Sequence, residues 1–334
     1  MKRRPCLTAL LALSLLLFGC GGQEPVEPET PPPVTVEEEV PPEPTFPNPL
    51  TGEPIREASH LIAVMINNAP AARPQTGLGS ADLVYEVEME GMVTRFLAFF
   101  YGDLPENVGS VRSARPYVMM LAKEWDAYFA HVGGSDDAFA KVKEWGIRDM
   151  DDVRGHRGFW VDKEGKRPHN TYLNLREALQ GKEPNGKFHD WEFTDPPLGP
   201  PDYKEIRFSY DKDNRPSYVF DEEEGVYRRF LNGKPHLDKA TGQQIEAANV
   251  ILQYARHRDL GTELLHIDVE LIGEGKAEYF LGGRYYTGTW RKKNLNSPTE
   301  YLDEEGKPIK FVRGKTWVQI LRPGKEVVKI PYES

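Results

Sequence analysis

From Leu61 onward, short apolar runs alternate with amphipathic segments of helical length, and this pattern limits the fold more than any other feature. Runs of strand length cover 61–66, 82–88, 93–101 and 127–132, and helical patterns cover 116–125, 135–145 and 171–180. Strands are usually about five or six residues long, whereas a 3.6-residue apolar period marks a helix. Hairpin-like and crossover connections both join these segments. We therefore predict an α/β domain with a mixed sheet over residues 48–190.

The second half of the chain has a different pattern. A Pro- and Gly-rich stretch between residues 184 and 203 separates it from the first half. Strand-length segments then follow one another, with turn sequences such as Asn232-Gly233 and Gly282-Gly283 between them. We predict a mainly β domain, a barrel or a sandwich, over residues 204–334, and an α+β class for the whole chain.

Length and charge exclude several classes of protein. A chain of 334 residues suits two domains. Its 42 Lys and Arg residues are outnumbered by 52 Asp and Glu residues, giving a net charge of −10, so we expect no nucleic-acid partner. The sequence contains no GxxxxGK[ST] loop, no HExxH and no CxxC pair. We accordingly predict no cofactor and no metal.

The N-terminus predicts where the protein is located. Three cations at residues 2–4 precede the apolar run Leu7–Phe18, which has the length of a signal peptide rather than of a membrane span. The run ends in Leu17-Phe18-Gly19-Cys20, which resembles a bacterial lipobox and implies a signal peptide over 1–19 and lipidation of Cys20. We therefore expect an extracytoplasmic protein that is anchored by lipid to the bacterial cell membrane. An uncleaved N-terminal anchor is the alternative.

A Pro- and Glu-rich tether follows over residues 20–47. Segments of this composition are extended and semi-rigid, so the tether is expected to hold the folded part away from the membrane. The acidic side chains of the tether also keep it off an anionic membrane surface.

Basic side chains at the ends of the predicted elements suggest an anion site, because binding sites are usually built at such positions. Guanidinium groups bind phosphate and carboxylate groups bidentately. A Gly-Gly-Ser turn before a predicted helix adds backbone N–H groups that can hold an anion. The candidate ligand-binding residues are Arg73, Arg95, Arg112, Arg115, Gly133, Gly134, Ser135 and Asn170. The alternative is a structural network in which the arginines pair with Glu86, Glu90 or Asp82.

Acidic and histidine side chains form a second candidate group. Glu86, Glu88 and Glu90 occupy every second position of one predicted strand, so Glu86 and Glu90 are expected to share a face with Glu88. Together with His131 and His169 they have the chemistry for acid–base catalysis or for binding a divalent cation. The alternatives are a solvated acidic face, hydrogen-bonded histidines, and an Asn170 that orients its loop or caps a helix.

Several motifs resemble those of the YerB-like family of bacterial lipoproteins. They are ARPQTGL, ADLVYE followed by EG and TRF, GSVRSARPY, HVGGS and RPHNTY, with GTW near Trp290 and KTWVQI near Trp317 in a separate C-terminal segment. The resemblance covers nearly all of the chain from about residue 48. It implies two domains and a lipid anchor. The main domain of that family has no known function, so the resemblance assigns no catalytic residue.

Three functional hypotheses remain open at this point. The first is a non-enzymatic lipoprotein that binds an anionic cell-envelope ligand or a partner protein through the arginines. The second is a hydrolase or transferase that acts on an envelope polymer through the glutamate and histidine side chains, by acid–base or metal chemistry. The third is a scaffold that docks a membrane protein through the β domain.

Overall fold

The structure is a computed structural model that describes residues 45–58 and 60–333. The predicted signal peptide, Cys20 and nearly all of the tether lie outside the described residues. Within the described part of the chain, no helix is both long and apolar enough to span a membrane.

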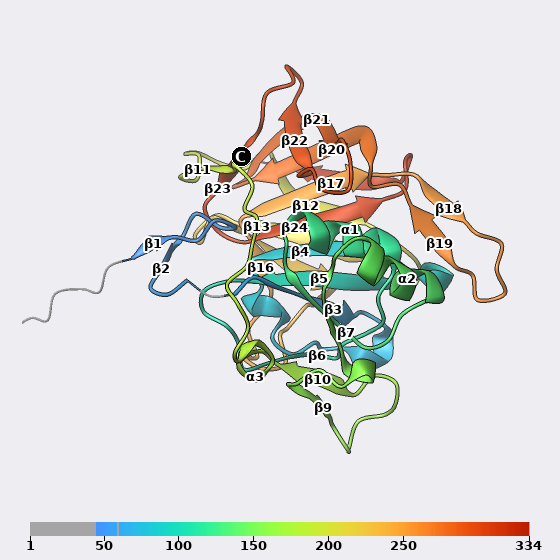
Figure 1. The fold of residues 1–334 in the computed structure, drawn as a ribbon. Helices are drawn as coiled ribbons and strands as arrows, with labels where there is room; N and C mark the ends of the chain where they lie inside the picture. Colours follow the sequence, from blue (N-terminus) through green and yellow to red (C-terminus); the bar gives the residue numbers. More distant parts are fainter. Residues whose placement is uncertain (1–44, 59, 334) are drawn as a thin grey trace, which may run out of the picture. The chain divides into compact units, whose positions relative to one another are not determined.

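A ten-stranded mixed sheet forms the centre of the fold (Figure 1). Its strands, in spatial order, are β22 (Glu300–Asp303), β21 (Arg284–Lys292), β20 (Gly273–Leu281), β17 (Asn249–Tyr254), β24 (Thr316–Leu321), β4 (Leu83–Glu88), β5 (Thr94–Phe100), β3 (Ile62–Asn67), β7 (Tyr128–His131) and β8 (Arg148–Asp151). The pairs β17–β24, β24–β4, β3–β7 and β7–β8 are parallel, and the others are antiparallel. The mixed sheet predicted from the sequence is therefore present.

The central strands are buried along their whole length because both faces of the sheet are covered. The helices α1 (Pro116–Glu124) and α2 (Asp136–Glu144) lie on one face, where Tyr117 and Leu121 join the same apolar cluster as Met65 and Leu97. Figure 1 shows both helices in front of the sheet. We call this face the helix face.

A second sheet covers the opposite face. It runs in the order β15 (Lys234–Pro235), β14 (Val226–Leu231), β13 (Pro216–Asp221), β12 (Tyr203–Phe208) and β25 (Val327–Pro331), and β16 (Glu246–Ala247) also pairs with β14. Its inward side chains, among them Ile206 and Tyr218, pack in one cluster with Val64 and Phe96 of the large sheet. Most of the strands after residue 204 are thus divided between these two sheets, and β24 is inserted between β17 and β4.

Shorter elements complete the fold. They are the pair β1 (Phe46–Pro47) and β2 (Pro54–Ile55), the sheet of β6 (Asn107–Gly109), β10 (Thr171–Asn174) and β9 (Phe159–Val161), helix α3 (Leu175–Leu179), the pair β11 (Glu192–Thr194) and β23 (Lys310–Val312), the hairpin of β18 (His257–Asp259) and β19 (Ile267–Val269), and the 3-10 turns η1 (Pro70–Ala72), η2 (Leu78–Ser80), η3 (Glu90–Met92) and η4 (Asp152–Arg154). The β18–β19 hairpin projects from the large sheet at the right of Figure 1.

The helix predicted over residues 171–180 is wrong in its first part. Thr171–Asn174 is strand β10, which pairs with β6 and β9, and only Leu175–Leu179 is helical. Asn174 caps this short helix by accepting a hydrogen bond from the backbone N–H of Glu177 at 2.9 Å. Tertiary pairing has overridden the local helical pattern here. The boundaries predicted for the two domains stay predictions, since strands from both segments meet in one sheet.

Candidate arginine site

Several parallel strands of the large sheet end at the same edge. Strands β3 and β4 both run antiparallel to β5 and so point in the same direction, while β7 and β24 run parallel to them. In open α/β sheets, ligands are usually bound in the crevice outside the carboxyl ends of the strands. The loops that follow these strands are therefore the first place to look for a site.

Three of the four candidate arginines meet at this edge, on the helix face. Arg95 begins β5 opposite Asn67, the last residue of β3. The loop that contains Arg112 and Arg115 is held between β3 and β7. The N–H of Arg112 donates to the carbonyl of Met65 at 2.8 Å, and its carbonyl accepts from the N–H of Val132 at 3.0 Å. We call Arg95, Arg112 and Arg115 the arginine cluster.

The cluster carries more positive charge than its partners neutralise. Glu90 accepts a hydrogen bond from Arg115 Nε and lies 3.9 Å from Arg95. The remaining contacts are to backbone carbonyls: Arg95 donates to Ser113 at 2.6 Å, Arg115 to Ala114 at 2.6 Å and Arg112 to Pro168 at 3.2 Å. Arg112 Nε is buried and has no acceptor among the described residues. Among the described residues, Glu90 is thus the only carboxylate that forms an ion pair with the cluster, and it pairs with Arg95 and Arg115 but not with Arg112.

The pKa values of the cluster reflect this imbalance. Burial, followed by the charge of Arg115, lowers the pKa of Arg95 to about 10, and Glu90 offsets this only in part. Burial and the neighbouring Arg115 also lower the pKa of Arg112. Burial alone would raise the pKa of Glu90, but its hydrogen bond and ion pair with Arg115 outweigh burial and lower it. The guanidinium groups repel one another, and a bound anion would relieve that repulsion.

The loop with His169 borders the cluster. Asn67 Nδ2 donates to His169 Nδ1 at 2.7 Å, so that nitrogen is unprotonated. Burial and the charge of Arg112 lower the pKa of His169. Asn170 instead donates to the carbonyls of Asp162 and Gly165, at 2.8 and 3.2 Å, and orients its own loop.

The Gly133-Gly134-Ser135 turn is next to the cluster, but its groups already have partners. The N–H of Gly133 donates to Asp151 Oδ1 at 2.8 Å, and Gly134 bridges to Ala114. The Ser135 hydroxyl caps α2 by accepting from the N–H of Ala138 at 3.3 Å. The turn therefore positions the arginine loop.

The four candidate catalytic residues do not converge. Both ring nitrogens of the fully buried His131 contact oxygen atoms of the protein, Asp149 Oδ1 at 2.7 Å and the Gly133 carbonyl at 2.8 Å, so neither is open to a substrate. Glu86 and Glu90 do not share a face. Strand β4 ends at Glu88, and Glu90 lies in the turn η3, where Gly91 has a φ of +65°. Only Glu90 and His169 lie beside the arginine cluster.

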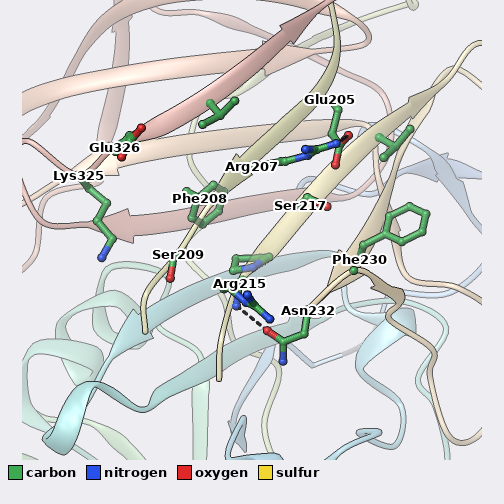
Figure 2. Close-up of a pocket in the computed structure, with 14 residues that line it drawn as sticks. Glu205, Arg207, Phe208, Ser209, Arg215, Ser217, Phe230, Asn232, Lys325 and Glu326 are labelled. Atoms are coloured by element: carbon green, nitrogen blue, oxygen red, sulfur yellow. Dashed lines mark hydrogen bonds and ion pairs between the residues drawn. The ribbon is translucent and has the colours of Figure 1, made fainter. Parts of the chain in front are cut away.

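A larger cavity lies away from the arginine cluster. A groove of about 800 Å³ follows the outer face of the second sheet, and Figure 2 shows its lining. Phe208, Pro216 and Phe230 contribute apolar surface, while Arg207 pairs with Glu205 at 2.5 Å within the groove. A smaller cleft of about 440 Å³ does adjoin the cluster, because Arg115 lines one end of it. No group of three or more His, Cys, Asp or Glu residues suited to a metal ion occurs in residues 45–58 and 60–333.

Comparison with known proteins identifies the family. Residues 50–187 match the N-terminal domain, and residues 205–318 the C-terminal domain, of the family described as "Protein of unknown function (DUF3048)". The chain belongs to the DUF3048 family. It is 32% identical over 271 residues to the Bacillus subtilis (strain 168) protein named "Putative lipoprotein YerB", an alignment that covers 78% of this chain and 80% of that protein. The crystal structure of YerB from Bacillus subtilis is similar, with a TM-score of 0.76 and 30% identity, and covers 85% of this chain and 100% of that one. The family resemblance inferred from the motifs is confirmed.

The two DUF3048 regions are joined by a buried ion pair on the face opposite the helices. Glu86, from the N-terminal region, accepts a 2.6 Å hydrogen bond from Arg229 of the C-terminal region, and both side chains are fully buried. Asn68, Thr94 and Asn214 also donate to Glu86. This arrangement makes Glu86 a structural residue of the interface between the two regions.

Arg73 belongs to the same face as Glu86 and is separate from the arginine cluster. Its guanidinium donates to Asn68 Oδ1 at 3.0 Å and to the carbonyl of Asp213 at 2.8 Å. Thr94 faces Glu86, whereas Arg95 faces the helices, because successive side chains of a strand point to opposite faces.

The cleft beside Arg115 lies at a second junction of the DUF3048 regions, since Arg258, Leu260 and His266 line its far wall. No sequence motif had indicated these three residues.

Proposed function

We propose that this DUF3048 protein is an extracytoplasmic, lipid-anchored protein that binds an anionic cell-envelope ligand at the arginine cluster. The location is supported by the lipobox-like sequence that ends at Cys20 and by the name of the Bacillus subtilis relative. The observation that carries the binding function is the excess of three guanidinium groups over the single carboxylate of Glu90, at the carboxyl edge of the parallel strands.

The chemistry of the cluster favours phosphate or carboxylate as the bound group. Guanidinium groups offer paired N–H donors that match these anions, and Arg112 retains a donor that no described residue uses. Partial burial also weakens the competition from water. Glu86 is buried against Arg229 on the opposite face of the sheet, and both ring nitrogens of His131 contact oxygen atoms of the protein, which favours binding over acid–base catalysis.

Thermal unfolding of the full chain in detergent micelles tests the proposal, with inorganic phosphate and pyrophosphate as probes. A ligand at about 100 times its Kd adds about 2.7 kcal/mol of stability, which raises the Tm by several degrees. The double variant Arg112→Gln/Arg115→Gln is expected to lose this rise.

The matched control is Arg291→Gln/Arg313→Gln. It removes the same charge from two arginines, with side chains 42% and 45% exposed, that pair with Glu300 and Asp195 elsewhere on the molecule. Sodium chloride at equal ionic strength controls for general screening. Equal rises in Tm for the cluster variant and the control variant would contradict the proposal.

One observation favours a second candidate, the scaffold. The groove in Figure 2 leaves apolar surface of Phe230 and Val328 on the outer face of the second sheet. Photo-crosslinking in membranes from Ser217, inside the groove, would capture one specific membrane protein if the groove is a docking surface. Crosslinking from the exposed Leu198 serves as the control, and equal products from the two positions would count against the scaffold.

A further inference from the structure

The cleft beside the arginine cluster has the dimensions of a small-molecule site. It lies between the helices α1 and α2 and the β18–β19 hairpin, and its volume of about 440 Å³ is within the range typical of ligand pockets. Arg115 belongs to both the cleft and the cluster. A ligand whose anionic group is bound by the arginine cluster can therefore place its remaining atoms in the cleft.

The walls of the cleft combine apolar and polar groups at close intervals. Met120 and Pro116 of α1 lie on one side, and Leu260 and Ile267 of the hairpin on the other. The polar side chains that also line it are Ser135, Asp137, Lys141, His266 and an Arg258–Asp268 ion pair at 2.8 Å. Trp145 also lines the cleft, with the Lys141 ammonium 5.4 Å from its ring centre.

The combination of apolar and charged side chains in the cleft favours a sugar over a lipid chain as its ligand. An acyl or isoprenoid chain would leave Lys141, Arg258 and Asp268 without water and without new partners, which is costly for charged groups. A sugar ring suits such walls, because its C–H faces are apolar while its hydroxyl edge both donates and accepts hydrogen bonds. The limited volume favours a mono- or disaccharide unit over a long polymer segment.

We propose that the ligand of this site is an anionic saccharide whose phosphate or carboxylate is bound by the arginine cluster and whose sugar lies in the cleft. This inference rests on the proposed function and adds the class of ligand to it. Phosphate and carboxylate would be bound by the same guanidinium groups, so the experiment below compares a sugar phosphate with a sugar carboxylate.

Isothermal titration of the full chain in detergent micelles provides the test. The probes are inorganic phosphate, glucose 1-phosphate, glucuronate and glucose. We expect at least one anionic sugar to bind about tenfold more tightly than phosphate, and glucose to bind far more weakly than that sugar. A preference for glucose 1-phosphate over glucuronate, or the reverse, identifies the anionic group.

Variants then locate the sugar. Leu260→Ala/His266→Ala is expected to remove the tenfold advantage of the anionic sugar and to leave the affinity for phosphate unchanged. Leu237→Ala is the matched control, because Leu237 is 42% exposed and Leu260 43% exposed, and Leu237 does not line the cleft. Preserved sugar affinity in the cleft variant would overturn the inference.

The two proposals fail in different ways. If phosphate binds through Arg112 and Arg115 but no anionic sugar binds more tightly, the saccharide inference is wrong and the anion site stands. If no anion binds at all, the proposed function itself is wrong. Binding of glucose that is independent of Arg115 would also overturn the inference, since it requires the charge and the sugar to be recognised together.

Discussion

Neutralising Glu86 should destabilise the protein more than almost any other single isosteric change. Glu86 and Arg229 are both fully buried, with 2.6 Å between the carboxylate and Nη2. The other groups around the guanidinium are neutral: the Tyr218 hydroxyl at 3.2 Å, His236 Nδ1 at 3.1 Å and the Trp317 ring at 4.8 Å. Burial, together with the charge of Arg229, holds the pKa of His236 well below its usual range. Glu86→Gln therefore leaves a buried cation without a counter-charge among its described contacts.

The expected cost follows from the burial of the pair. Breaking a buried ion pair by removing one partner typically costs about 3–5 kcal/mol. Glutamine has nearly the same volume as glutamate, so no cavity adds to this figure, and its amide oxygen retains part of the hydrogen bonding. We expect a loss of about 3 kcal/mol in the free energy of unfolding, and a Tm lowered by roughly 5–10 °C.

Urea unfolding followed by tryptophan fluorescence measures this loss, since Trp317 lies against Arg229. Glu305→Gln is the control. It breaks a pair with Lys307 in which both side chains are 72% exposed, and it should leave the midpoint unchanged. The double variant Glu86→Gln/Arg229→Met removes both charges and should be more stable than Glu86→Gln alone. A Glu86→Gln variant within about 1 kcal/mol of the parent would refute the electrostatic account.

Three further predictions concern single side chains. Glu90→Gln should increase the affinity for phosphate severalfold, measured by isothermal titration, because it removes the counter-charge of the arginine cluster; a loss of affinity would contradict this account of the cluster. Burial would raise the pKa of Glu278, but hydrogen bonds from Lys276 and Lys329 lower it to about 2. The folded-state pKa is thus below the unfolded value, so the stabilising effect is complete above about pH 4.5 and is lost as the pH falls toward 2. Unfolding at a series of pH values should show this loss in the parent and not in Glu278→Gln. Ser135→Ala should cost about 1 kcal/mol in urea unfolding through loss of the α2 cap, and an unchanged midpoint would rule the cap out as a stabilising contact.

Most elements of the first half could be predicted because their signals are local. Strand β3 was expected over 61–66 and is found at Ile62–Asn67, and α2 begins after its Ser135 cap. A cap or an apolar period acts within a few residues and therefore survives in the fold. Thr171–Asn174 shows the limit of this reasoning, because its partners, β6 and β9, lie elsewhere in the sequence.

The candidate site was predictable in part for the same reason. Arg95, Arg112 and Arg115 lie at element ends, and the common direction of the strands brings those ends to one edge. Arg73 follows the end of β3 in the sequence, but its side chain lies on the opposite face of the sheet. Successive side chains of a strand point to opposite faces of the sheet, but the sequence does not specify which layer covers each face. The separation of Arg73 from the arginine cluster could therefore not be predicted.

The sequence by itself determined most of the local elements, the arginine-rich loops and the family, since each depends on residues that are close together in the chain. Only the tertiary structure decided that β24 would lie between β17 and β4, that Glu86 would be buried against Arg229, and that the β18–β19 hairpin would form the wall of a cleft beside Arg115. These arrangements depend on contacts between residues far apart in the chain, for example 67 positions for Asn249 and Thr316 and 143 for Glu86 and Arg229. They are selected by the burial of whole faces rather than by any local preference.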